Sequence, residues 1–208
     1  MAERERHSNA VPAAMLGVVV LGLVVTGWSP KDRFTWVMEV APIGIGFPVL
    51  IATYARFRFT TLVYVLLAVH AWILMIGGHW TYAEVPLGFW MERAFGFTRN
   101  HYDRIGHFAQ GFVPALIGRE LLLRTSPLKG SRWLPFLVFT ACMTISVTYE
   151  FVEWWTALAS GAASDAFLGT QGDPWDTQED MFMCAIGATT ALLTMTRVHD
   201  RALARLGV

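Results

Sequence analysis

Charged residues are scarce in this sequence. Only 15% of its 208 residues are Asp, Glu, Lys or Arg, whereas soluble domains carry about a quarter. The 16 basic and 16 acidic residues give a formal net charge of +0, so no overall field attracts the chain to nucleic acid. The sequence has no basic patch with interleaved aromatic side chains, which such binding needs. We therefore expect no nucleic-acid partner.

The sequence also lacks the motifs of several common enzyme classes. Neither H-E-x-x-H of zinc proteases nor G-x-S-x-G of α/β-hydrolases is present. The two cysteines, Cys142 and Cys184, both lie in apolar segments, so we expect buried thiols rather than a disulfide staple. No internal repeat, low-complexity tract or long linker divides the chain. We therefore predict a single domain over residues 1–208.

Long apolar runs dominate the sequence. Hydrophobic residues make up 54% of the chain, and the mean hydropathy is +0.44. A transmembrane helix needs about 20 mostly apolar residues, and runs of this length in lipid pair their backbone groups as helices. We therefore predict an all-α polytopic membrane protein in the lipid bilayer, a bundle of about six transmembrane helices. The predicted spans are residues 11–28, 33–54, 60–78, 104–124, 133–158 and 177–196.

The basic residues predict how the bundle is oriented. Residues 11–28 are followed by no clear A-x-A cleavage site, so we interpret them as a retained helix rather than a signal peptide. Six spans place both termini on one side, which then holds 11 of the 16 Lys and Arg residues, including Arg4 and Arg6. The positive-inside rule makes that side cytoplasmic. We expect a multi-pass protein of the bacterial inner membrane with both termini in the cytoplasm.

With that orientation, most of the acidic and imidazole groups in the spans lie toward the outer face. An ionised group at the bilayer centre costs about 2.5–3.5 kcal/mol on insertion scales. Such groups become tolerable when they gather around a cation, a proton or a water-filled cavity. We therefore predict one polar site near the extracytoplasmic face.

Helical spacing selects the candidate ligands of this site. Asp103 and His107 are four residues apart, Glu150 and Glu153 are three apart, and Asp180 opens the last predicted span, so each pair shares one helix face. Carboxylate and imidazole ligands on facing helices bind metal ions in di-iron bundles. We predict His107, Glu150, Glu153 and Asp180 as ligands of a divalent metal ion. A mixed His and carboxylate set suits Zn, Mn or Fe, and an all-oxygen subset suits Mg or Ca.

Other polar residues are candidates for proton transfer or for the rim of the site. We expect Asp103 or His101 to transfer protons. The expected rim or secondary residues are Glu39, His79, Asp173, Asp176 and Gln178.

Structural roles stay open for several of these side chains. Asp173 before Pro174 is a good N-cap for the last span, and acidic groups suit the positive end of a helix. Asp103 has Arg104 and Arg99 as nearby ion-pair partners in sequence. His70 is expected to be a packed core histidine. Glu120, beside Arg119 and Arg124, is expected to be an interfacial salt-bridge partner.

Three sequence blocks together resemble a known family. The blocks "NHYDRIGHFAQGF", "TYEFVEWW" and "FLGTQGDPWDTQEDM" are similar to those of the YjdF-type family of uncharacterised bacterial inner-membrane proteins. The resemblance covers most of the chain from about residue 30 onward and implies a multi-span membrane protein. A weaker similarity is to VanZ-like membrane proteins, through Asp103 or Arg104, His107-Phe108, Glu150, and Asp180 with Gly187. Those proteins are linked to glycopeptide resistance.

Three functions are compatible with these residues. The first is a metal-dependent enzyme that acts on an envelope lipid or lipid-linked substrate from the outer face. The second is a non-catalytic binding or assembly factor, whose aromatic loop at residues 79–103 docks a partner. The third is a transporter coupled to protons or cations, since intramembrane acids are typical of such sites.

Overall fold

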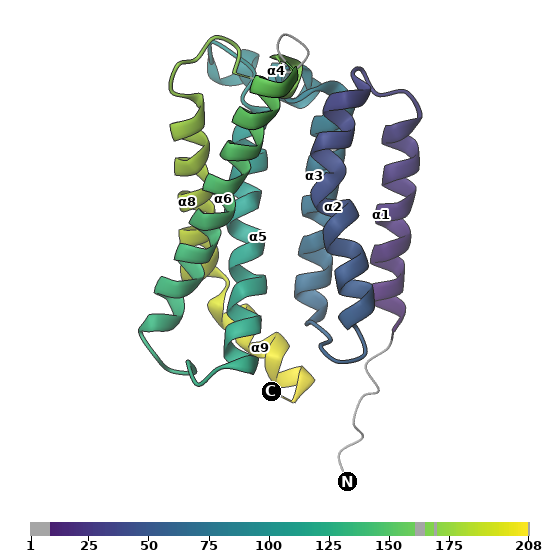
Figure 1. Cartoon of the computed structure of the whole chain (residues 1–208). Helices are drawn as coiled ribbons and strands as arrows, with labels where there is room; N and C mark the ends of the chain where they lie inside the picture. Colours follow the sequence, from purple (N-terminus) through teal and green to yellow (C-terminus); the bar gives the residue numbers. More distant parts are fainter. Residues whose placement is uncertain (1–8, 161–164, 169, 208) are drawn as a thin grey trace.

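A computed structural model describes residues 9–160, 165–168 and 170–207, and in this part of the chain every regular element is helical (Figure 1). The prediction of an all-α membrane protein is therefore confirmed. The elements in order are α1 (Ala10–Trp28), α2 (Arg33–Thr53), α3 (Thr61–Trp80), the 3-10 turn η1 (Tyr82–Glu84), α4 (Pro86–Phe95), α5 (Tyr102–Thr125), α6 (Trp133–Ser160), α7 (Asp165–Leu168), α8 (Asp176–Thr194) and α9 (Thr196–Leu206).

Each predicted span corresponds to one of six long helices, α1, α2, α3, α5, α6 and α8, which form an elongated bundle (Figure 1). By length and composition, α1, α2, α3 and α6 can each cross a membrane, and α8 qualifies together with α9, which is bent from it by 62°. α5 falls short because it carries several charged residues. Composition thus supports four or five spans. α5 would be the sixth, and the evidence for it is its position alongside the other long helices in the bundle.

The ends of the chain agree with an even number of crossings. α1 begins and α9 ends at the same end of the bundle (Figure 1). We call this the inner end, following the orientation that the basic residues predict. Arg4 and Arg6, which contribute to that prediction, lie outside the described residues.

The charges of α5 are sheltered because α5 occupies the centre of the bundle. It packs against α3, α6 and α8, and Arg104, Arg119 and Glu120 are buried. Each of them contacts an oppositely charged side chain. Large apolar side chains on the outer helices are exposed instead, for example Val24, Ile45 and Leu193 at 60%, 70% and 79%. This arrangement, with polar groups inside and an apolar outer surface, fits a bilayer.

Two glycines bring the backbones of α5 and α8 into contact. Gly111 faces the carbonyl of Cys184, and Gly187 faces the carbonyl of Phe108, with no room for a Cβ atom at either position. Small residues permit such close approach between membrane helices. The α5–α8 contact is the most extensive between two helices of the described chain, so it fixes the outer ends of both helices relative to each other.

A buried polar network holds the inner end of the bundle. Glu120 is fully buried and accepts hydrogen bonds from Arg124 (2.7 Å) and from the backbone N–H and hydroxyl of Thr60 (3.0 and 2.8 Å). His199 Nε2 lies 3.0 Å from Glu120 Oε2, and Arg119 Nη1 lies 3.2 Å from His199 Nδ1. The expected salt bridge of Glu120 is present with Arg124, whereas Arg119 pairs with Asp200 instead. Glu120 joins α3, α5 and α9 in the interior.

Candidate functional site

Three potential metal ligands meet at the outer end of α5 and α8. Nε2 of His107 lies 3.4 Å from Oδ1 of Asp103 and 3.6 Å from Oδ1 of Asp180. The ligand atoms of the three residues all lie within 4.8 Å of one another, and His107 and Asp180 are buried. Asp103 and His107 share a face because they are one turn apart, and the glycine contact between the helices brings Asp180 to them. We call these three residues the Asp-His-Asp cluster.

The other nitrogen of His107 faces away from this cluster. Nδ1 lies 3.2 Å from Oε1 of Gln110 and 3.9 Å from Oε1 of Glu150. Glu150 is buried at 6% exposure, and its Oε1 has no hydrogen-bond partner among the described residues. A buried carboxylate oxygen without a partner is costly, so this position favours a bound proton, cation or ligand.

The cluster opens into a cavity of about 190 Å³ that lies between α2 and α3 on one side and α5 and α6 on the other. We call these two sides the amino-terminal and carboxy-terminal halves of the bundle. The walls of the cavity come from α2, α3, η1, α5, α6 and α7. The polar lining consists of Glu39, His70, Tyr82, Asp103, His107, Gln110, Tyr149 and Glu153. The apolar lining consists of Pro42, Leu74, Pro114, Ile145, Phe167 and Leu168, with Gly106 between the two groups.

Two tyrosines shape the polar part of this cavity. The hydroxyl of Tyr149 on α6 donates to Oε2 of Glu39 on α2 at 3.1 Å, which bridges the two halves of the bundle. Tyr82, in the connection above α3, is buried at 5% exposure. Burial and the nearby Glu39 raise the pKa of the Tyr82 hydroxyl well above its ordinary value, so this group is a hydrogen-bond donor at neutral pH.

Two arginines, Arg99 just before α5 and Arg104 in its first turn, hold the acidic stretch that leads into α8. Arg104 is buried and pairs with Asp180, with Asp176 at 2.9 Å and with Glu179 at 2.8 Å. Arg99 pairs with Asp173 and Asp176, each at 2.8 Å. These contacts explain why so many carboxylates occur in this short stretch.

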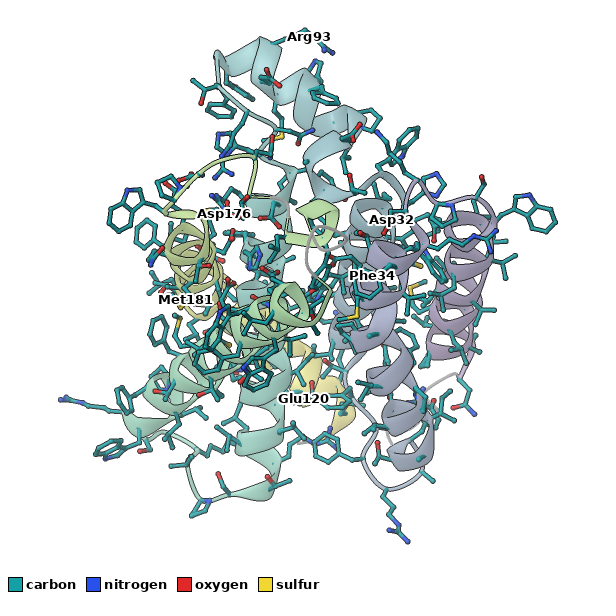
Figure 2. The ribbon with its side chains drawn as sticks, turned by 45° about the horizontal axis from the view of Figure 1, so that its top comes forward. Asp32, Phe34, Arg93, Glu120, Asp176 and Met181 are labelled. Atoms are coloured by element: carbon teal, nitrogen blue, oxygen red, sulfur yellow. The ribbon has the colours of Figure 1, made fainter. Side chains whose placement is uncertain are left out.

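Backbone contacts complete the attachment of this segment. Gln171 accepts from the N–H of Asn100 at 3.1 Å and donates to its carbonyl at 2.8 Å. Asp173 accepts from the N–H of Trp175 at 2.8 Å, so it closes a turn just before α8 rather than capping the helix itself. Asp176 at the start of α8 and Glu120 lie toward opposite ends of the bundle (Figure 2), so the site and the inner network are separate.

The structure brings some of the predicted site residues together and separates others. His107, Asp180 and Glu150 lie close together, and Asp103 lies beside His107 as a potential ligand. Glu153 lines the cavity, as does Glu39, so both face the same space as the cluster.

The remaining predicted residues have other surroundings. The His101 ring packs edge-on against Phe97 with centroids 4.7 Å apart, and burial together with Arg99 and Arg104 lowers its pKa. His79 Nδ1 lies 2.8 Å from the Thr26 carbonyl, which joins α3 to α1. Asp173 and Asp176 pair with arginine, and Gln178 is exposed on α8.

Sequence reasoning missed the roles of Arg104, Tyr149 and His70. The sequence suggested Arg104 as an ion-pair partner of Asp103 and as part of the VanZ-like resemblance, but its pairing with the start of α8 was not predicted, although its spacing of three residues from His107 places it near the same helix face. Tyr149 lies four residues before Glu153 on the cavity face of α6, a spacing that could have indicated it. His70 was expected to be a packed core residue, but it lines the cavity and its Nε2 has no partner among the described residues.

Comparisons with known proteins agree with the membrane architecture. Residues 11–201 match the family model described as "Predicted membrane protein (DUF2238)". The chain is 48% identical over 190 residues to the "Inner membrane protein YjdF" of Escherichia coli (strain K12), and the match covers 91% of each chain. No solved structure matches. These matches confirm the predicted family resemblance and the predicted inner-membrane location.

Proposed function

The chain belongs to the DUF2238 family of predicted membrane proteins, and we propose that it is an enzyme that uses a divalent cation. The cation binds at the Asp-His-Asp cluster, and the substrate is an envelope lipid or lipid-linked molecule that occupies the adjoining cavity. The metal-ligand role of Asp103 in this proposal replaces the free proton-transfer role expected for it.

The observation that carries this proposal is the position of His107 between two carboxylates. When Nδ1 donates to Oε1 of Gln110, the lone pair of Nε2 faces Oδ1 of Asp103 and Oδ1 of Asp180. Three electron-rich atoms facing one another need positive charge between them. A divalent cation supplies it, with Gln110 orienting the ring from its other side, as is common for metal-bound histidines.

Arg104, next to the cluster, competes with a metal ion for these carboxylates, and so does a proton on Nε2 of His107. Arg104 pairs with Asp180 and lies 3.6 Å from Asp103 Oδ2. Glu150 and Glu153 lie nearby, and no ion pair among the described residues joins either to an arginine, so acidic groups outnumber basic ones around the cluster. This imbalance favours a further cation at the cluster.

Glu153 is the residue we assign to proton transfer. A divalent cation lowers the pKa of a bound water and polarises an ester or phosphoester oxygen. Glu153 lines the cavity without belonging to the cluster, so its carboxylate is free to accept a proton from an attacking water. Glu39 is less suited because one of its oxygens already accepts from Tyr149. His101 is less suited because its ring packs on Phe97.

The distribution of polar residues favours this function over transport. The interior between the cavity and the Glu120 network is packed with apolar side chains, including Ala115, Leu116, Val138, Cys142 and Ala188. A transporter would need a polar path through this layer. A site confined to the outer half suits chemistry on an outer-face substrate.

Metal analysis tests the cation site. We expect purified protein exposed to Zn, Mn or Mg salts and then desalted to retain a stoichiometric metal ion, detected by elemental mass spectrometry. The double variant His107→Ala/Asp180→Asn should lose it, whereas Glu84→Gln, an exposed acid on the same side of the bundle, should keep it. No retained metal, with a melting temperature that chelator does not change, would contradict the proposal.

An assembly role is the second candidate because of exposed aromatic side chains around α4. We define the aromatic patch as Phe89, Trp90, Phe95 and Phe97, which are 38%, 54%, 63% and 40% exposed. The patch lies on the connection between α3 and α5, near Arg93 at the outer tip of the molecule (Figure 2). The test is complementation of a strain that lacks the protein. If Trp90→Ser/Phe95→Ser failed to restore the wild-type phenotype while His107→Ala/Asp180→Asn restored it, the assembly role would replace the enzymatic one.

A further inference from the structure

We propose that the cavity is entered sideways from the bilayer, between α2 and α6, by a phospholipid of the outer leaflet. This inference rests on the proposed function for what the site does, and it adds the substrate class and the route. The side chains at the entrance are Pro42 of α2 and Ile145 of α6. We call this entrance the lateral portal.

The location of the two portal residues supports a lateral entrance. Both line the cavity, and both are exposed on the surface of the bundle, Ile145 at 45%. Pro42 lies nine residues from the outer end of α2, which is about 14 Å along the helix. Ile145 lies fifteen residues from the outer end of α6, or about 22 Å. At these depths the surroundings are hydrocarbon, since the core of a bilayer is about 30 Å thick.

The polarity of the cavity lining changes with depth along α5 and α6. On α6 the lining runs from Glu153 through Tyr149 to Ile145, from the outer end inward. On α5 it runs in the same sense from Asp103 through His107 to Pro114. On these two helices the polar side chains therefore lie where lipid headgroups lie, and the apolar ones lie at the depth of acyl chains. On α3 the order is reversed, with Leu74 farther out than His70. A water-soluble substrate has no use for the apolar part of the lining, whereas a phospholipid matches both parts.

One ring nitrogen of His70 is available to a lipid in the cavity. Its Nε2 is buried, has no hydrogen-bond partner among the described residues, and belongs to a side chain that lines the cavity. His70 lies ten residues from the outer end of α3, about 15 Å below it, deeper than the Asp-His-Asp cluster. A phospholipid carries ester carbonyls on the chain side of its phosphate. We expect one of these carbonyls to accept from His70 while the phosphate lies near the cluster.

The packing of the bundle leaves room for this route. α2 packs against α3 and α1, and α6 packs against α5 and α8. Two links join α2 and α6 at the cavity: the hydrogen bond from Tyr149 to Glu39, and α7, which packs against both helices. The hydrogen bond lies one helical turn farther out than Ile145, and α7 reaches α2 near its outer end, where Phe167 contacts Phe34. Both links leave the portal below them.

A photolabelling experiment tests the portal. Full-length protein is reconstituted in vesicles of a saturated phosphatidylcholine that contain a small fraction of a phospholipid with a diazirine in one acyl chain. After illumination, mass spectrometry maps the labelled residues. We expect label on Leu74 or Pro114, which are half-buried inside the cavity, in addition to the lipid-facing surface.

Matched variants separate the portal from general effects. Ile145→Trp should remove the interior label because the indole fills the entrance, whereas Ile145→Ala should keep it. Leu158→Trp places the same side chain at a position of α6 that is 70% exposed and does not line the cavity, and it should also keep the label. Interior positions that stay unlabelled in the wild type, or equal labelling in Ile145→Trp, would overturn the proposal.

Two further arms distinguish the route from its alternatives. A water-soluble glycerophosphodiester with a diazirine, added to protein in detergent, would overturn the portal if it labelled the interior equally in wild type and Ile145→Trp. Metal retention and interior label, both measured on the wild type, separate this inference from the proposed function. Interior label without retained metal keeps the portal and removes the cation-dependent enzyme, and retained metal without interior label keeps the cation site and removes the portal. The variant His107→Ala/Asp180→Asn should lose the metal and keep the interior label.

Discussion

The side chains of Gln110 and His107, one turn apart on α5, meet with 3.2 Å between Oε1 and Nδ1. This contact orients the imidazole so that Nε2 faces the carboxylates of Asp103 and Asp180. The amide therefore determines which ring nitrogen is available to a cation, although Gln110 is not itself a ligand.

We expect Gln110→Leu to weaken cation binding by about 10- to 100-fold, the usual cost of losing the group that orients a metal-bound histidine. Titration calorimetry with Zn or Mn salts measures the change. Gln178→Leu is the matched control because Gln178 is exposed on α8, and its affinity should equal that of the wild type. Equal affinities for both variants would show that His107 is oriented by other contacts.

Arg104→Gln should make the protein more dependent on a divalent cation. The wild-type guanidinium pairs with Asp180 and lies near Asp103, so its removal leaves two ligand carboxylates short of positive charge. We expect a lower melting temperature without metal, since breaking a buried ion pair costs about 3–5 kcal/mol. We also expect a larger rise in melting temperature when metal is added.

Arg99→Gln is the control for this effect. Arg99 pairs with Asp173 and Asp176 and contacts neither Asp103 nor Asp180 in the ion pairs of the described chain. It should lower stability while leaving the metal-induced rise at the wild-type value. The same rise in Arg104→Gln as in Arg99→Gln would mean that Arg104 does not compete with a cation.

Glu120→Gln should destabilise the fold without affecting the cation site. Glu120 is fully buried and interacts with Thr60, Arg124 and His199, so the variant loses the carboxylate that pairs with Arg124, at a cost of about 3 kcal/mol. Thermal unfolding in detergent measures the loss of stability, and metal retention should not change. Asp200→Asn, at a side chain 55% exposed, should cost about 1 kcal/mol or less. A Glu120 variant as stable as the Asp200 variant would contradict this role.

Gly111→Ala should impair the contact between α5 and α8. A methyl group there would collide with the carbonyl of Cys184, and forced overpacking of this kind costs about 1–3 kcal/mol. Gly44→Ala on α2 has no heavy atom near its added Cβ and should be neutral or stabilising by up to about 1 kcal/mol. The two variants are compared by thermal unfolding and by metal retention, and only Gly111→Ala should lower both.

The sequence was sufficient to predict the helices but not their partners. Apolar runs of about 20 residues predicted the six long helices because hydropathy is a local property. α5 is one of these predicted helices, but the partners of its charged side chains lie far away in the sequence. Arg104 is neutralised by Asp176 and Asp180, more than 70 residues later in the chain, and no spacing rule relates such distant positions.

The candidate site was predictable to the same extent. The spacing of four residues between Asp103 and His107 placed them on one face, and the structure agrees. The contribution of Asp180 depends on the close approach at Gly111 and Gly187, which fixes the register between two helices. The predicted ligands Glu150 and Glu153 lie on α6, whose rotation about its own axis depends on packing. For this reason Glu150 approaches His107 while Glu153 faces the cavity.

The glycine contact between α5 and α8 also bears on motion. All three residues of the Asp-His-Asp cluster lie on these two helices, whose backbones touch at Gly111 and Gly187. The opposite wall, with Glu39 and His70, belongs to α2 and α3. If the cavity opens to bind or release a substrate, α2 and α3 can move while the three residues of the Asp-His-Asp cluster keep their relative positions. A spin label on α2 should then show a change in mobility or distance on substrate binding that a label on α8 does not show.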